Sequence, residues 1–183
     1  MSLKEKLDAV KQQMAQLPTE VLEKFGASLQ ALIARHPEEH VLKAGDNAPL
    51  AVLEDADGKA VDLRALLARG PLVLVFYRGL WCPFCNVTLS EYQQMASDLA
   101  ASGATLVAVS AQSRAATLKT RESLGVRYQL LSDPGNQLAR QYGIVFELEP
   151  ELEAVYRALG ADLKALNDCD DLSLPMASAF SRT

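Results

Sequence analysis

The spacing of apolar residues predicts two amphipathic helices at the start of the chain. The first apolar series recurs at intervals of three and four residues, and comprises Leu3, Leu7, Val10, Met14 and Leu17. Pro18-Thr19-Glu20 interrupts it, and a second series then runs from Val21 to Ile33 and ends near Arg35-His36-Pro37. We interpret residues 1–36 as a helical hairpin extension that packs on its own domain; the alternative is a dimerisation arm.

After a connector over residues 36–49, the pattern changes to short apolar runs separated by helical segments. Leu50 to Leu53 and the Asp57-Gly58 turn predict a short hairpin, after which Asp62 caps a short helix. Buried strands are predicted over residues 72–77, 104–109 and 128–131, and helices over 83–101, 113–124, 134–143 and 150–166. Strands that alternate with helices in this way predict an α/β domain with a parallel sheet.

The composition is that of one soluble domain. The 183 residues are 49% hydrophobic and 22% charged, with a net charge of −5, which argues against nucleic acid or an anionic membrane as a partner. The charged and apolar residues alternate after Met1, so we expect neither a signal peptide nor a membrane span and place the protein in the cytoplasm. Three cysteines in a reducing compartment do not form a structural disulfide framework.

The chemistry of the chain is concentrated in two cysteines that follow the strand over residues 72–77. Pro83 suits the first position of a helix, which places Cys82 at the N-cap and Cys85 about one turn inside. The unpaired N–H groups and the positive dipole end of a helix stabilise a thiolate there. We therefore expect both sulfurs to face one mouth and to cycle between dithiol and disulfide.

Three further residues bear on this pair. Arg78 is the nearest fixed cation and either lowers the pKa of a thiol or extends into solvent from its loop. Trp81 is expected to pack against the end of the sheet and to shield the thiols from water. Cys169 lies among carboxylates that disfavour a thiolate, and we interpret it as an incidental surface cysteine; the alternative is a resolving role.

A zinc site is the main alternative use of the pair. Tetrahedral zinc needs two more ligands, and the chain offers only His36, His40 and Cys169 beyond Cys82 and Cys85. The two histidines lie in an acidic, proline-containing connector. We therefore expect no metal and no organic cofactor.

The stretch F-Y-R-G-L-W-C-P-F-C-N, followed by A-T-L-V-A-V-S and L-L-S-D-P-G-N-Q-L-A-R-Q-Y-G, resembles the peroxiredoxin-like members of the alkyl hydroperoxide reductase/thiol-specific antioxidant (AhpC/TSA) family. The resemblance covers residues 44–176 and implies a thioredoxin-like three-layer sandwich, followed by a divergent short tail over residues 177–183. It also implies a thiol-dependent peroxidase that reduces hydrogen peroxide or alkyl hydroperoxides, with Arg78 available to hold a peroxide oxygen and a thioredoxin-like protein as reductant. A general thiol–disulfide oxidoreductase, and a non-catalytic redox sensor that binds a partner, are the alternatives.

The match to the peroxiredoxin motif is incomplete. On this chain the peroxidatic cysteine falls on Cys85, the motif threonine on Cys82 and the motif proline on Arg78. Cys82 is the attacking thiol by analogy with thioredoxins and Cys85 by analogy with peroxiredoxins. The second analogy predicts that Cys85→Ser abolishes peroxide turnover, whereas Cys82→Ser retains a single-turnover burst.

The C-terminal sequence departs most from the family. Thioredoxin-like folds finish with an antiparallel hairpin and a helix, and a cis-proline before the hairpin faces the cysteines. Here Ala177 stands near the position of that proline. We expect both the final hairpin and the helix to be missing. The arginine that many peroxiredoxins bring from this region is not evident. An open sheet edge exposes unpaired backbone, so we expect the N-terminal hairpin or a partner subunit in a homo-oligomer, most simply a dimer, to cover it.

Overall fold

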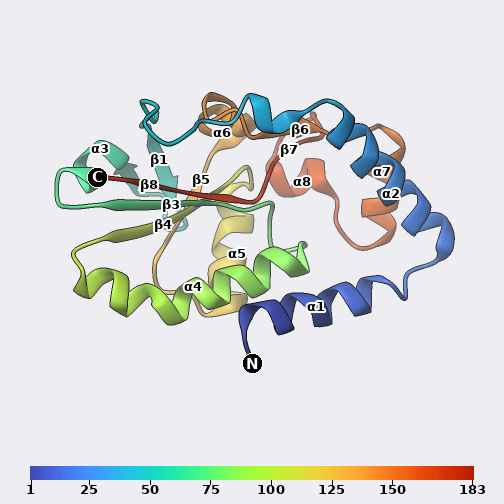
Figure 1. Ribbon diagram of the computed structural model, residues 1–183, viewed down its shortest axis with the longest axis horizontal. Helices are drawn as coiled ribbons and strands as arrows, with labels where there is room; N and C mark the ends of the chain where they lie inside the picture. Colours follow the sequence, from blue (N-terminus) through green and yellow to red (C-terminus); the bar gives the residue numbers. More distant parts are fainter.

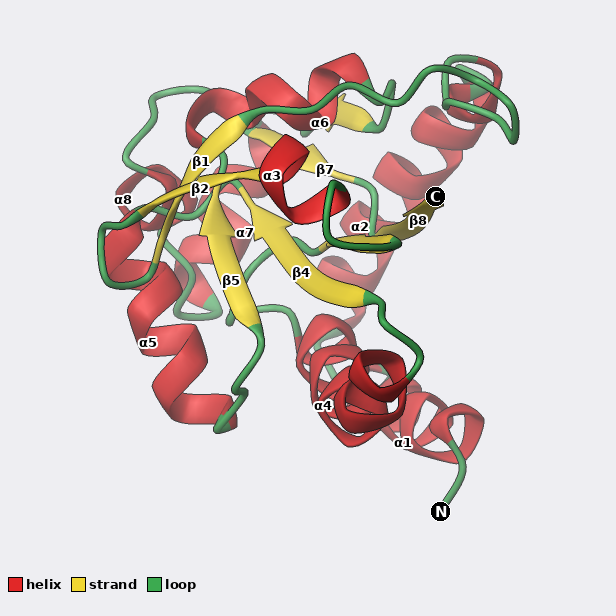
Figure 2. Cartoon of the chain, turned by 90° about the vertical axis from the view of Figure 1, so that its left-hand side faces the viewer, coloured by secondary structure: helices red, strands yellow, loops and turns green.

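The computed structural model describes residues 1–183 and contains a six-stranded mixed sheet with helices on both faces (Figures 1 and 2). The sheet order is β2-β1-β5-β4-β3-β8. Its strands are β1 (Val52–Asp55), β2 (Ala60–Asp62), β3 (Leu72–Phe76), β4 (Thr105–Ser110), β5 (Gln129–Ser132) and β8 (Ser178–Arg182). A second, two-stranded sheet pairs β6 (Val145–Glu147) with β7 (Ser173–Pro175), neither of which the sequence pattern predicts.

The parallel core predicted from the sequence is confirmed. β3, β4 and β5 are parallel neighbours, with Leu72 opposite Thr105 and Val107 opposite Gln129. Antiparallel strands flank this core on both sides, because β1 pairs with β5 and β8 pairs with β3. The sheet is therefore mixed rather than wholly parallel.

Alternate residues of β3 face two different helical layers. Leu74 and Phe76 pack in the cluster that includes α3 (Leu63–Leu67) and α6 (Gln137–Gln141). Val75 packs toward α4 (Pro83–Ala101), which shares its face of the sheet with α5 (Arg114–Leu124). Figure 2 shows α4 and α6 on opposite sides of the strands. This alternation of a fully buried strand produces the predicted three-layer arrangement.

The two N-terminal helices diverge and contact different parts of the domain (Figure 1). α1 (Leu3–Met14) lies along α4, where Lys6 Nζ is 2.6 Å from Glu91 Oε2. α2 (Thr19–Ala34) contacts α7 (Glu151–Ala158), but none of its residues is fully buried. The short 3-10 helix η1 (Pro37–Glu39) then leads into the domain. None of the helices combines the length and the apolar character that a membrane span requires.

Residues 150–166 do not form the single helix predicted from their spacing. α7 ends at Ala158, and a separate helix, α8 (Leu163–Asn167), begins after a turn. Gly160 has φ 87° in that turn, a left-handed conformation that favours glycine and ends a helix. The prediction of a continuous helix was wrong because the apolar spacing continues across the break. Residues 134–143 form η2 (Pro134–Asn136) and α6, as expected.

The prediction that both strands of the final hairpin are missing is wrong for one of them. β8 pairs with β3 along its whole length, from Phe76 opposite Ser178 to Leu72 opposite Arg182. Phe180 anchors the strand, with its ring centroid 4.8 Å from that of Tyr142. β8 therefore provides one of the two strands of the hairpin expected to be missing, and it ends at Arg182. β8 is then the outermost strand on this side of the sheet, so the expectation that the N-terminal hairpin or a partner subunit covers the sheet edge stays a prediction, as does the dimer.

Candidate active site

Cys82 and Cys85 lie at the start of α4, as the sequence predicts. Cys82 is the N-cap residue and Pro83 the first residue of the helix. The backbone N–H of Cys85 donates to Cys82 Sγ over 3.4 Å, so the sulfur occupies the place that a capping oxygen usually takes. A backbone N–H in the first turn, which has no acceptor within the helix itself, therefore points at the Cys82 sulfur.

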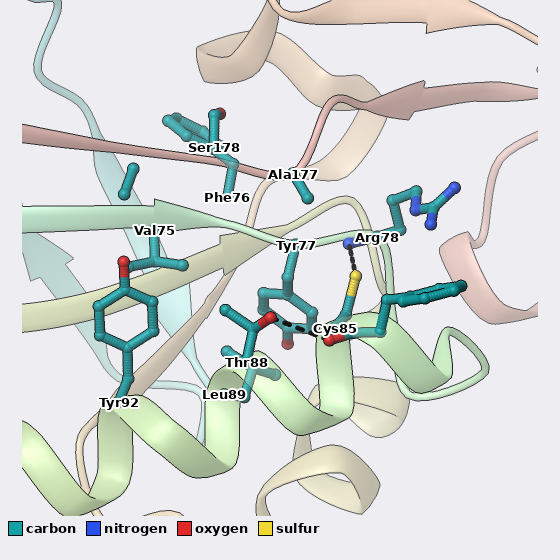
Figure 3. A pocket seen from close by; sticks show the side chains of 12 residues that line it. Val75, Phe76, Tyr77, Arg78, Cys85, Thr88, Leu89, Tyr92, Ala177 and Ser178 are labelled. Carbon is teal, nitrogen blue, oxygen red and sulfur yellow. Dashed lines mark hydrogen bonds between the residues drawn. The ribbon is translucent and has the colours of Figure 1, made fainter. Parts of the chain in front are cut away.

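Arg78 contacts both cysteines. Its Nη2 donates to Cys82 Sγ over 3.1 Å, and its backbone N–H donates to Cys85 Sγ over 3.5 Å, as the dashed line in Figure 3 marks. The guanidinium also lies 5.7 Å from the centroid of the Trp81 ring. Of the two roles considered for Arg78, the structure places it beside the thiols and not in open solvent.

The two thiols differ in acidity because one donates to the other. The hydrogen bond from the Cys85 thiol, together with the Arg78 charge and the Cys85 N–H, lowers the pKa of Cys82 from 9.0 to about 6 against the opposing effect of burial. The pKa of Cys85 is raised far above its usual range, first because its proton is held by the Cys82 sulfur, and further by burial and the Cys82 charge. At neutral pH the pair therefore carries one thiolate, at Cys82, and one thiol, at Cys85.

Each cysteine lines a cavity of its own, although the side chains are largely buried. Cys82 is 1% exposed and Cys85 3% exposed. Cys85 lines a small cavity of about 250 Å³ between β3, α4 and the start of β8, together with Thr88, Tyr92 and Ala177 (Figure 3). Cys82 lines a larger groove of about 580 Å³. The expectation of one shared mouth thus gives way to two openings, both of which Arg78 lines.

The larger opening, which we call the apolar groove, lies between the cysteine loop and the helices α2 and α7. Its lining is mostly hydrophobic and includes Phe25, Leu29, Trp81 and Tyr156 beside Cys82. The Trp81 and Tyr156 rings meet edge to face, with centroids 5.1 Å apart. Trp81 therefore packs against α7 and forms a wall of the route to Cys82.

Three residues at the site escaped the sequence analysis. Gln112 accepts a hydrogen bond from the Leu80 N–H at 2.8 Å, Asn86 donates to the Leu80 carbonyl at 2.7 Å, and Tyr156 packs on Trp81. Gln112 follows β4, whose carboxyl end adjoins that of β3, so its position in the predicted sheet was a usable signal. Tyr156 had no such signal because α7 reaches the site only through tertiary packing.

The other candidate side chains lie apart from this site. Cys169 follows α8 and lines neither the Cys85 cavity nor the apolar groove. His36 pairs with Glu38 on the surface of the connector. No group of three or more His, Cys, Asp or Glu residues is arranged to hold a metal ion.

A cysteine pair at the start of the helix that follows the central strand, within a three-layer sandwich, defines a thioredoxin-like thiol protein. Residues 44–160 match the AhpC/TSA family, and the chain belongs to this family.

Similar proteins agree with this classification. Peroxiredoxin Q of Oryza sativa subsp. japonica is 28% identical over 104 residues, which are 57% of this chain and 48% of the rice protein. The chain thus spans about half the length of that relative. The thiol-disulfide oxidoreductase ResA of Bacillus subtilis is 28% identical over 62% of this chain and 66% of its own length.

Solved structures show the same fold. Peroxidoxin BcpB of Mycobacterium tuberculosis is 30% identical, with a TM-score of 0.56 over 60% of this chain and 73% of its own. Peroxiredoxin Q of Xanthomonas campestris, at 20% identity, has a TM-score of 0.56 over 73% of each chain. The thioredoxin-like fold predicted from the sequence is therefore confirmed.

Proposed function

We propose that the protein is a thiol-dependent peroxidase that cycles Cys82 and Cys85 between dithiol and disulfide. The observation that carries this proposal is the environment of Cys82 Sγ, which accepts hydrogen bonds from Arg78 Nη2 at 3.1 Å and from the Cys85 N–H at 3.4 Å. A fixed cation and a helix N-terminus stabilise the thiolate that attacks a peroxide. Membership of the AhpC/TSA family supports the same reaction class.

In the first step the Cys82 thiolate attacks one oxygen of the hydroperoxide. The S–O bond forms as the O–O bond breaks, which gives a sulfenic acid on Cys82 and an alkoxide or hydroxide that takes up a proton and leaves as alcohol or water. Arg78, whose guanidinium already lies at the sulfur, stabilises the negative charge that moves to the leaving oxygen.

In the second step the Cys85 thiol condenses with the sulfenic acid on Cys82. A disulfide forms and one water molecule is released. The hydrogen bond to the Cys82 thiolate and the charge on that thiolate both raise the pKa of Cys85, and both are lost once Cys82 is oxidised, so Cys85 can then give up its proton and attack the Cys82 sulfur. An external dithiol then reduces the disulfide and is itself oxidised to a disulfide; a thioredoxin-like protein is the reductant that the family resemblance implies.

The apolar groove supports an organic hydroperoxide as substrate. The groove has a volume of about 580 Å³, a mostly hydrophobic lining and one charged side chain, Arg78, which are the size and character of a small-molecule site. An alkyl or aryl group on the peroxide would be removed from water there, whereas hydrogen peroxide would gain nothing from these walls.

A thiol–disulfide oxidoreductase is the second candidate. The more acidic thiol is the first cysteine of the pair, which is the attacking position in thioredoxins. ResA proteins, which are thiol-disulfide oxidoreductases, are among the relatives. In that reaction Cys82 would attack a protein disulfide and no peroxide would be consumed.

Single-cysteine variants test the peroxidase proposal. In Cys85→Ser, one equivalent of hydroperoxide should give one sulfenate, located on Cys82 by mass spectrometry after trapping, with no steady turnover. Cys82→Ser should react far more slowly, and Cys169→Ser should behave as the unaltered protein. This expectation is the reverse of the one drawn from the peroxiredoxin motif.

Three outcomes would contradict the proposal. A sulfenate on Cys85 in Cys82→Ser, with fast oxidation, would assign the attack to the other sulfur. If the unaltered protein consumes no hydroperoxide with thioredoxin and its reductase but reduces insulin disulfides, the second candidate holds; a peroxide-responsive disulfide without either activity would indicate a sensor.

A further inference from the structure

The loop between β3 and α4 determines where the reactive groups sit. It carries Arg78 at its start and Cys82 at its end, and a turn in which the Cys82 N–H donates to the Gly79 carbonyl at 3.1 Å brings the two together. Gly79 has φ 153°, and a Cβ there would meet the Trp81 ring and the Gln112 amide oxygen within 2.8 Å. The loop is thus packed tightly against Gln112.

The peptide groups of Leu80 are held from two sides. Gln112 Oε1 accepts from the Leu80 N–H at 2.8 Å, and Asn86 Nδ2 donates to the Leu80 carbonyl at 2.7 Å. These two contacts satisfy both backbone groups of the residue midway between Arg78 and Cys82.

Gln112 is itself fixed by the structure around it. It is 0% exposed, its Nε2 donates to Thr120 Oγ1 at 2.8 Å, and its backbone N–H donates to Ser110 Oγ at 3.0 Å. Thr120 belongs to α5 and in turn donates to the Ala116 carbonyl at 2.9 Å. A continuous set of hydrogen bonds therefore runs from α5 through Gln112 to the cysteine loop.

We propose that Gln112 and Asn86 are positioning residues that clamp Leu80 and thereby hold Arg78 against the Cys82 sulfur. They act through the loop and not on the substrate, since neither lines the groove or the Cys85 cavity. The inference rests on the thiolate role proposed for Cys82. Loss of either contact frees the loop, lengthens the approach of the guanidinium to the sulfur and weakens the thiolate.

The readout is the pH at which Cys82 becomes reactive. The titratable groups that face Cys82 are Arg78 and Cys85 from its own loop and helix and Tyr156 from α7, and the clamp variants change none of them. The reduced protein is alkylated with iodoacetamide over a range of pH, and mass spectrometry locates the label on Cys82. No peroxide or reductase is needed.

Gln112→Leu and Asn86→Leu should each raise the pH midpoint of Cys82 alkylation by about one unit, a roughly tenfold loss of thiolate stabilisation. The double variant should shift it by less than the sum, because both residues hold the same segment. Ser113→Ala is the matched control: it removes the hydrogen bond to the Ala116 N–H that caps α5 next to Gln112, without touching the loop. Its midpoint should stay unchanged even though it costs stability.

Unchanged midpoints in Asn86→Leu and Gln112→Leu, with native circular dichroism, would overturn the clamp. Asn86 is partly exposed, so its variant decides the matter should Gln112→Leu fail to fold. If the unaltered protein itself shows a midpoint near 9, the thiolate at Cys82 is wrong and the proposed function fails with it; a low midpoint that the variants do not move refutes the clamp alone.

Discussion

The depressed pKa of Cys82 predicts that the stability of the reduced protein rises with pH. The folded state holds this thiol at about 6, whereas an unfolded chain returns it to 9.0. Between these values the unfolded state binds more protons than the folded state, so raising the pH favours folding. The contribution is complete above the unfolded value and is lost as the pH falls through the folded one.

The size of the effect follows from the two pKa values. The full difference corresponds to about 4 kcal/mol, and the part gained between pH 6 and pH 8 to about 2 kcal/mol. Cys85 does not oppose the gain in this range, because its pKa is raised and it stays protonated in both states.

Urea unfolding of the reduced protein and of Cys82→Ser at several pH values measures the contribution of Cys82 ionisation to stability. The difference in unfolding free energy between the two proteins cancels the groups outside the cysteine pair and should grow by about 2 kcal/mol from pH 6 to pH 8. A difference that stays constant over this range would show that Cys82 titrates alike in both states, and the electrostatic account of the site would fail. Cys169→Ser serves as the control that removes a thiol away from the site.

Two further predictions concern the groove and the fold. Leu29→Asn, on the wall of the groove, should lower kcat/KM for an aryl hydroperoxide roughly fivefold and leave kcat/KM for hydrogen peroxide unaffected. The control Val52→Asn, at an exposed position on β1, should change neither value. Equal losses for both substrates in Leu29→Asn would contradict an apolar substrate site. Gly143→Ala should cost about 2 kcal/mol more in thermal unfolding than Gly45→Ala, because both glycines have positive φ but only a Cβ at Gly143 meets a neighbouring backbone.

Elements determined by local sequence were predictable. α4 runs from Pro83 to Ala101 as the pattern indicated, because the apolar strand before it, the proline at its first position and the glycine after it all act locally. The side chain of Asp62 caps α3 as expected, accepting from the Arg64 N–H at 2.8 Å.

Elements that depend on distant partners were not predictable in the same way. β8 has the sequence Ser-Ala-Phe-Ser-Arg and little strand propensity of its own. Its place depends on backbone pairing to β3 and on Phe180 packing against Tyr142. The same holds for the short strands β6 and β7, which pair only with each other.

The residues of the candidate site also fall into a locally determined group and a group that depends on tertiary packing. Arg78, Cys82 and Cys85 lie within eight positions of one another, and the turn between strand and helix brings them together. Gln112 and Tyr156 come from elements far along the chain. Sequence reasoning therefore singled out the cysteine pair with Arg78 and Trp81 as candidates, but not Gln112 or Tyr156.

The geometry also bears on the question that the two family analogies left open. In the peroxiredoxin motif a threonine stands where this chain has Cys82, at the N-cap of α4. A sulfur at this position receives the Cys85 N–H and the Arg78 guanidinium, whereas a sulfur one turn later receives only the backbone N–H of Arg78. Negative charge therefore gathers on the first cysteine, and the second keeps its proton. Replacing the threonine by cysteine does not simply add a resolving thiol to a peroxiredoxin site. The acidic position then falls on the first cysteine, and for this reason we propose that Cys82 makes the attack.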